Sequence, residues 1–319
     1  MFLTPLPLFI VASLRYNVGT DYPYTYTQHF LWRLNGYDLS AKFEAGFIKL
    51  IDLIQLFTDE PQWLFVVCAF IFSLFTAIAI YQQSNDYALS FLVVVISGIY
   101  FAYLNLMRNY VALAIVLYAF KYIEERKFKH FLFWVLLASS FHVTALLFLP
   151  VYFIYNIKIN RWVVIGIIVT VFIGLPVIDI IARYIISYTK YAYYYNSTDS
   201  NVTPQRIYLL INILILCIQI YSYRFMKEDI KFQLHMKLEV LIVVLALGSY
   251  VVPMIRRLIL VPMFTHILVI PYIENYKINK NLRKLIVISL CIICMISSYR
   301  QITTLGMHEV LPYQTIFSR

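Results

Sequence analysis

Charged residues are scarce in this chain: 13% of its 319 residues are Asp, Glu, Lys or Arg, whereas 62% are hydrophobic. Soluble globular chains carry about 25% charged residues and about 45–50% apolar ones. The composition therefore excludes a soluble protein and predicts an integral membrane protein. A span needs ~20 apolar residues, so the chain has room for about ten spans in one membrane domain, 1–319, with no separate soluble domain.

The sequence also lacks the usual signatures of metal, nucleotide and serine-nucleophile chemistry. Its histidines are scattered, and it contains no His-x-x-x-His, P-loop, dinucleotide fingerprint or Gly-x-Ser-x-Gly. Cys291 and Cys294 have the spacing of a redox or metal pair, but they lie in an apolar run without a second pair, which favours packing. We therefore expect neither a metal nor a cofactor.

Ten apolar segments define the expected architecture, an all-α polytopic membrane protein. The first has no basic n-region and no cleavage site, so we interpret it as a short span and not as a signal peptide. The segments are residues 2–14, 63–81, 87–106, 110–123, 130–155, 162–186, 207–223, 238–252, 258–273 and 285–298.

Lys and Arg are densest in the short segments 121–129, 224–237 and 277–284. Such loops are typical of the cytoplasmic side, and this placement argues against nucleic-acid binding despite a net charge of +10. Three crossings between the first two basic loops would put them on opposite sides, so one segment must be re-entrant or broken. We favour 130–155, at Ser139-Ser140-Phe141-His142; the alternative is 162–186, interrupted by Gly174-Leu175-Pro176.

This topology gathers positive charge on the outer side, where the positive-inside rule does not explain it. The loops 15–61 and 187–205 lie there too. Arginines at outer helix ends predict an anionic partner. The outer charged and polar residues are Arg15, Asp21, Glu44, Arg108, His142, Arg206, Arg256, Arg257 and Arg300.

Arg108 and the adjacent pair Arg256 and Arg257 interrupt apolar sequence, where an arginine must be paired or face water. Arg108 is alternatively a snorkelling residue at a helix end. The stretch Arg15-Tyr-Asn-Val-Gly19-Thr-Asp21 places an arginine suited to phosphate and a carboxylate on either side of a glycine, which indicates a binding site. The alternative interpretation is an interfacial loop with tyrosines in an aromatic belt. A histidine such as His142 is more often structural than catalytic.

Four motifs together resemble the EpsG-like branch of the Wzy-type bacterial polysaccharide polymerases. They are Arg15-Tyr16-x-Val18-Gly19-Thr20-Asp21-Tyr22 followed by Tyr26, Glu44-x-Gly46-Phe47, Met107-Arg108-Asn109-Tyr110-Val111-Ala112, and Phe141-His142-x-Thr144-Ala145-Leu146. They span residues 15–150, with a weaker similarity at 256–271. Asn109 stands where the family usually has glutamine.

The resemblance implies a GT-C-like glycosyltransferase of the bacterial cytoplasmic membrane, with its active site facing outward. It would polymerise capsule, exopolysaccharide or O-antigen from undecaprenyl-diphosphate-linked donor and acceptor glycans, in the bilayer and in some systems with a chain-length regulator. On this hypothesis Arg108, Arg256, Arg257 and Arg15 bind the diphosphate, and Tyr22 and Tyr26 contact glycan. The base is Asp21, Glu44 or His142. A flippase of lipid-linked glycans is the alternative function; it should show internal repeats, and the sequence shows none.

Overall fold

The computed structural model describes residues 4–155, 206–250 and 260–318, together with isolated positions between 173 and 187. The elements in this part of the chain are helices, which confirms the all-α class. The chain divides into two compact units, one of residues 1–149 and 264–319 and one of residues 150–263. The first unit holds four of the predicted site motifs.

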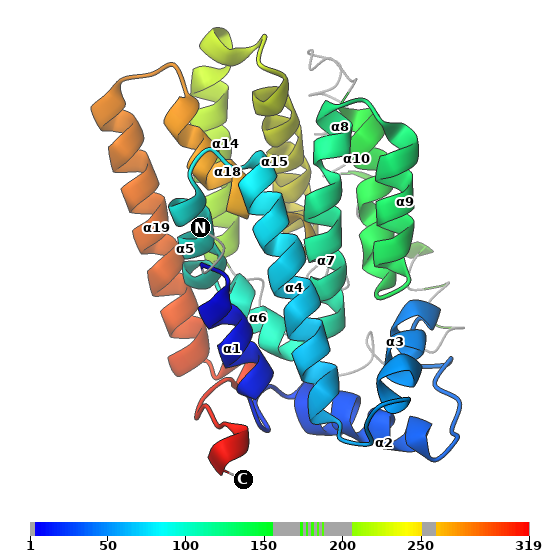
Figure 1. Cartoon of the computed structure of the whole chain (residues 1–319). Coiled ribbons are helices and arrows are strands. Elements are labelled where there is room, and N and C mark those ends of the chain that lie inside the picture. The colour runs from blue at the N-terminus through cyan, green and yellow to red at the C-terminus, as the bar shows by residue number, and fades with distance from the viewer. Residues whose placement is uncertain are drawn as a thin grey trace. The chain divides into compact units, whose positions relative to one another are not determined.

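The first unit is a helical bundle built around α7. Nearly every residue of α7 is buried, and it packs against α4 and α9 (Figure 1). Alanines at 112, 114 and 119 permit this close approach of neighbouring helices. The elements are α1 (Leu6–Leu14), η1 (Tyr22–Thr27), α2 (Gln28–Leu34), α3 (Ala45–Gln55), α4 (Gln62–Gln83), α5 (Tyr87–Ile96), α6 (Ile99–Asn105), α7 (Met107–Ala119), α8 (Lys121–Glu124), α9 (Phe128–Ser139), η2 (Val143–Phe148), α18 (His266–Tyr272), η5 (Ile273–Asn275), α19 (Lys280–Thr303), η6 (Met307–Glu309) and η7 (Ile316–Ser318).

The second unit contains α10 (Leu149–Ile154), which continues from η2, and α14 (Arg206–Met226), α15 (Ile230–Gly248) and α17 (Leu260–Met263). Ile242, Ala246 and Met263 form a small core there, and Tyr208 packs against it. The Lys237 ammonium is buried and donates to the Tyr155 carbonyl at 2.6 Å. Arg256, Arg257 and the predicted loop 187–205 lie outside the described residues, apart from Ser187.

Three described helices are long and apolar enough to cross a membrane: α4, α14 and α19. The pair α5 and α6 makes a fourth candidate span, bent by 54°. The bend lies at Ser97 and Gly98, where Gly98 adopts a φ of +84° that ends α5. The sequence indicated one continuous segment over 87–106, so the bend is a new finding. The count of about ten spans stays a prediction.

The segment 130–155 is interrupted where the sequence favoured a break. Helix α9 ends at Ser139, His142 is extended with φ −155° and ψ 125°, and η2 then begins at Val143 and packs back against α9. Whether both halves open to one side of the membrane remains a prediction. The alternative break at Gly174 to Pro176 falls mostly outside the described residues.

The two ends of the first unit differ in charge. Helix α8 and the start of α19, which carry basic segments 121–129 and 277–284, lie at one end (Figure 1). The opening motif, α2, the α6–α7 junction and the α9–η2 turn lie at the other. The predicted site residues of this unit are thus separated from its basic loops, and the outward direction of that end stays a prediction from loop charge.

Ser90 fastens α5 to α18, since its buried hydroxyl donates to the Ile267 carbonyl at 2.8 Å. We expect Ser90→Ala to lower the free energy of unfolding by about 1–3 kcal/mol, because this carbonyl loses its donor. Ser97→Ala is the matched control: Ser97 bonds the Val93 carbonyl one turn back at 2.6 Å, so its loss should stay within about 0.5 kcal/mol. Detergent-micelle unfolding measures both, and equal losses would contradict the assignment.

Candidate functional site

Arg15, the first residue of the opening motif, is fully buried. Its guanidinium donates to the Leu104 carbonyl and contacts the Met107 sulfur, and it lies 5.0 Å from the centre of the Phe65 ring. Leu104 is near the end of α6, where carbonyl groups have no partner within the helix. Arg15 thus anchors the opening motif to the α6–α7 junction, and it forms no ion pair with any described residue.

The backbone after Arg15 is also held closely against the bundle. Gly19 has a φ of +97°, and a Cβ there would lie 2.7 Å from the Leu104 carbonyl oxygen. The Asp21 N–H donates to Asn105 Oδ1 at 2.9 Å. Glycine is therefore required by backbone conformation and by close approach to the protein's own main chain.

Gln62, at the start of α4, holds the same loop through hydrogen bonds of both its amide nitrogen and its amide oxygen. Its nitrogen donates to the carbonyls of Ser13 and Arg15, at 2.6 and 3.1 Å, and its oxygen accepts from the Tyr22 hydroxyl at 2.8 Å. The Tyr22 ring stacks on Phe65 with centroids 4.0 Å apart, so it is packed inside the protein. Sequence reasoning missed Gln62, and a polar residue opening an apolar span was the available signal.

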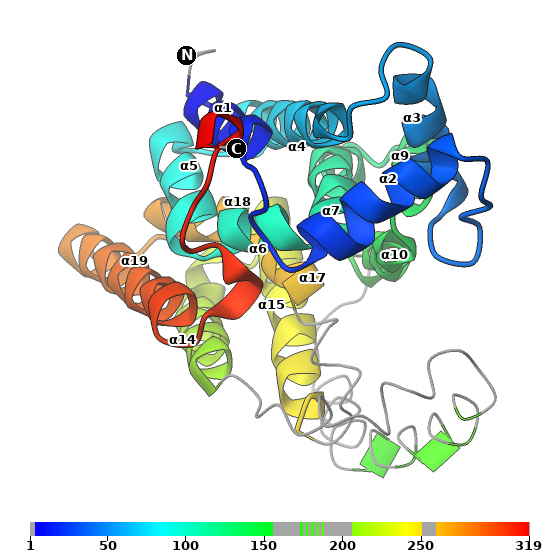
Figure 2. The ribbon, with the colours of Figure 1, turned by 90° about the horizontal axis from the view of Figure 1, so that it is seen from below.

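The C-terminal segment closes over this loop from the opposite end of the chain. The N–H groups of Tyr16 and Gly19 donate to the carbonyls of Gln314 and Glu309, at 2.9 and 3.1 Å. The Tyr313 hydroxyl donates to the Val11 carbonyl of α1 at 2.5 Å. Figure 2 shows the C-terminus beside α1. Residues 309–314 therefore act as a strap on the opening motif, which no sequence pattern indicated.

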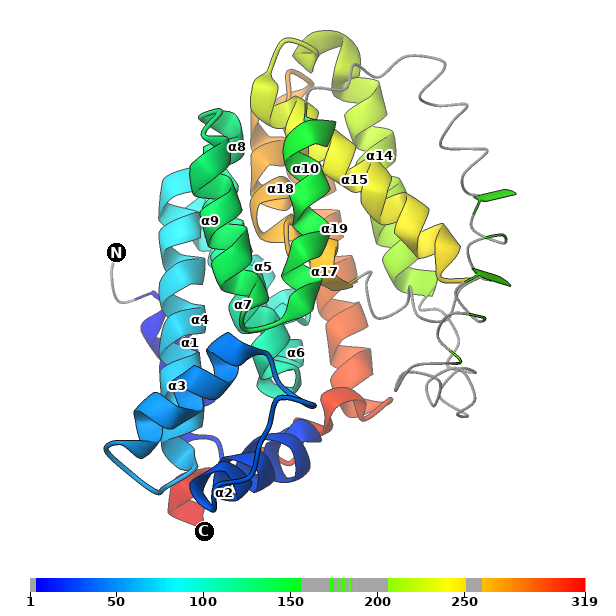
Figure 3. The ribbon, with the colours of Figure 1, turned by 90° about the vertical axis from the view of Figure 1, so that its right-hand side faces the viewer.

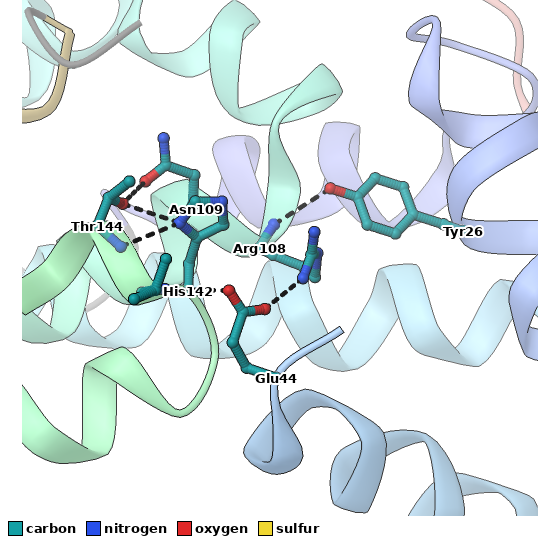
Figure 4. A network of polar contacts seen from close by, with 7 residues as sticks. Tyr26, Glu44, Arg108, Asn109, His142 and Thr144 are labelled. Carbon is teal, nitrogen blue, oxygen red and sulfur yellow. Dashed lines mark hydrogen bonds and ion pairs between the residues drawn. The ribbon is translucent and has the colours of Figure 1, made fainter. Parts of the chain in front are cut away.

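Arg108 and Glu44 form an ion pair at the N-terminus of α7, with Nη1 2.5 Å from Oε2 (Figure 4). The guanidinium also lies 4.4 Å from the centre of the Phe43 ring. Its Nε is buried and has no hydrogen-bond partner. The second Glu44 oxygen accepts from the Val143 N–H at 3.1 Å. A single carboxylate therefore joins α3, α7 and the α9–η2 turn.

Tyr26 reaches the same place from η1, a π-helical turn of a kind frequent at functional sites. Its hydroxyl accepts from the Arg108 backbone N–H at 3.3 Å. Burial raises the pKa of Tyr26 to about 12, and the Arg108 charge opposes this only in part. The phenol therefore stays neutral at physiological pH.

His142 lies on the other side of the ion pair, in the turn before η2. Its Nδ1 is 2.8 Å from the Thr144 hydroxyl, which in turn donates to Asn109 Oδ1 at 2.8 Å. The backbone N–H of Thr144 also donates to Nδ1, at 3.4 Å, so this nitrogen carries no proton and the imidazole is neutral. The network gives a structural role to Asn109 and Thr144, which the sequence placed in the motifs without assigning them a function.

The structure thus brings together Glu44, Arg108, His142 and Tyr26 from four segments. Asp21 belongs to the neighbouring loop, where its Oδ1 accepts from the Thr25 hydroxyl at 3.0 Å. Among the described residues, no three His, Cys, Asp or Glu side chains are grouped as a metal site would need. The site consists of one cation and its carboxylate beside a neutral imidazole and a neutral phenol.

A family model named the EpsG family matches residues 1–315. The chain belongs to the EpsG family. This membership confirms the resemblance of the motifs and marks a polymerase-like membrane protein of polysaccharide biosynthesis. No curated protein and no solved structure matches the chain at a significant level.

In this EpsG-family protein, α3 is attached to α9 through Gly46, as Figure 3 shows for the two helices. The Phe47 N–H donates to the Ser140 carbonyl at 3.1 Å, and a Cβ on Gly46 would lie 2.8 Å from that oxygen and 2.2 Å from the Ser140 Oγ. We expect Gly46→Ala to displace Glu44 and to lower thermal stability, because a backbone oxygen blocks the added carbon. Ala45→Ser, at the exposed neighbour, is the control. Unchanged melting of Gly46→Ala would refute this packing.

Proposed function

We propose that this EpsG-family protein is a polysaccharide polymerase that joins undecaprenyl-diphosphate-linked repeat units at the outer face of the bacterial cytoplasmic membrane. The observation that supports this most is that the Arg108 guanidinium is held in place while one of its donors has no hydrogen-bond partner. The guanidinium is oriented by Glu44 and by aromatic rings, yet its buried Nε has no partner. A preformed guanidinium with free donors suits a diphosphate, which needs planar, charge-assisted hydrogen bonds.

In the proposed reaction, an acceptor hydroxyl attacks the anomeric carbon of the donor glycan. The new C–O bond forms as the bond from that carbon to the diphosphate oxygen breaks, and its electron pair leaves with undecaprenyl diphosphate. Arg108 stabilises the negative charge that develops on the leaving group, a role that needs no metal. The acceptor proton passes to a base, for which Asp21, Glu44 and His142 are the candidates.

The other proposed residues contribute in different ways. Arg256 and Arg257, which lie outside the described residues, are proposed to bind the diphosphate as well. Arg15 adds positive charge and fixes the opening loop, since Leu104 and Met107 occupy its terminal nitrogens. Contacts of Tyr22 and Tyr26 with glycan remain predictions, because both rings are packed inside.

Purified protein supplied with its undecaprenyl-diphosphate-linked repeat unit should produce a ladder of multiples on a gel. We expect Arg108→Ala to reduce the rate about 100-fold or more, because a donor to developing charge is lost. Arg108→Lys should recover only part of it, since an ammonium cannot replace the planar fork. Arg224→Ala is the matched control, an exposed arginine near the end of α14 in the basic segment 224–237, and should retain the rate.

A full ladder from Arg108→Ala would remove this residue from the site. If the wild type leaves the repeat unit unextended but moves it across a liposome bilayer, the protein is a transporter of lipid-linked glycans and the polymerase proposal is wrong.

A further inference from the structure

The hydrogen bonds around His142 define which of its nitrogens carries the proton. Nδ1 faces two groups of Thr144: the backbone N–H, at 3.4 Å, and the hydroxyl, at 2.8 Å. A backbone N–H can only donate, so Nδ1 must accept from it. A proton on Nδ1 would point directly at another proton. The neutral imidazole therefore carries its hydrogen on Nε2.

Asn109 completes this arrangement through the Thr144 hydroxyl, which has a single proton. The amide oxygen and nitrogen of Asn109 exchange places by a half-turn about the terminal bond. In the structure the Asn109 oxygen faces the Thr144 hydroxyl, and the single hydroxyl proton cannot serve both this oxygen and His142 Nδ1. With the amide turned so that its nitrogen faces Thr144, the amide donates to the hydroxyl and the hydroxyl donates to His142 Nδ1. Each hydrogen bond between Asn109, Thr144 and His142 then has one donor and one acceptor, and the proton on His142 stays on Nε2.

The opposite nitrogen of His142 is available to a ligand. Nε2 forms no hydrogen bond with any described residue, and His142 itself is only partly buried. The charged groups of the same network are Arg108 and Glu44. The network thus places a neutral N–H near a guanidinium whose buried Nε has no partner, and both kinds of donor suit an anion.

We propose that His142 is a neutral hydrogen-bond donor that binds the diphosphate of the lipid-linked substrate through Nε2–H, and that Thr144 and Asn109 are positioning residues that hold it in this form. The proposal rests on the proposed function for the identity of the anion. It removes His142 from the three candidate bases and leaves Asp21 and Glu44 for that role.

The first test measures the tautomer directly. Protein labelled with [15N]histidine is studied by two-bond 1H–15N correlation in detergent at pH 7, and the His142 signals are assigned by their absence from His142→Gln. We expect the Nε2–H pattern. Asn109→Asp should shift it towards Nδ1–H, because a carboxylate only accepts and so draws the hydroxyl proton away from Nδ1. An Nδ1–H or doubly protonated ring in the wild type overturns the proposal.

The second test measures binding of farnesyl diphosphate, a short soluble analogue of the lipid diphosphate, by titration calorimetry. His142→Gln keeps an N–H donor at about the reach of Nε2, whereas His142→Leu keeps only bulk. We expect the leucine variant to bind about 10- to 100-fold more weakly, because a hydrogen bond to a charged group is lost. The glutamine variant should stay close to the wild type in binding.

Equal binding by the two variants overturns the donor role, as does a wild type that does not bind the analogue. A glutamine variant that binds normally but no longer polymerises shows instead that His142 is the base. If binding and tautomer follow expectation but the wild type forms no ladder, the polymerase proposal fails while the assignment of His142 as a diphosphate donor stands.

Discussion

The ion pair between Arg108 and Glu44 is the constraint on which this end of the first unit depends. A guanidinium at the start of a largely buried helix needs a partner, and Glu44 comes from a different segment to supply it. The same carboxylate accepts from Val143, so the loop that carries α3 is fastened to α7 and to the α9–η2 turn at once. Gly46 permits the approach, since a side chain there would strike Ser140.

The interruption between α6 and α7 explains why two arginines gather here. A helix that ends leaves carbonyl groups without partners, and one that begins leaves N–H groups without partners. Arg15 satisfies the Leu104 carbonyl, and Tyr26 accepts from the Arg108 N–H. Each side chain keeps a buried Nε without a partner, but the two differ in their surroundings. Arg15 is fully buried with its terminal nitrogens on Leu104 and Met107, whereas Arg108 is partly exposed and paired with Glu44. The break thus produces both an anchor and a candidate anion site.

The sequence predicted local and charge-driven features well. It indicated the helical class, the interruption near His142 and the placement of Arg108, Glu44 and His142 at one end, because charge within apolar sequence is costly and therefore informative. It did not indicate the Gly98 bend or the strap of residues 309–314. Those depend on a backbone conformation and on main-chain bonds between distant segments. Neutral amides such as Gln62 and Asn109 carry little signal in sequence, since their roles appear only when their partners are in place.

An ion pair at the proposed diphosphate site has a physical consequence for how a substrate binds. Because Glu44 pairs with Nη1 of the Arg108 guanidinium, an incoming diphosphate brings negative charge close to a carboxylate, and the repulsion between the two opposes binding. Neutral donors offset part of this cost without adding a permanent charge: the phenol of Tyr26, which stays protonated, and the imidazole of His142, whose Nδ1 accepts a hydrogen bond. The ion pair with Glu44 in turn fixes the position of the Arg108 guanidinium. On the proposed function, affinity for the anion is thereby moderated while the geometry of its site is fixed in advance, which favours release of the proposed diphosphate product.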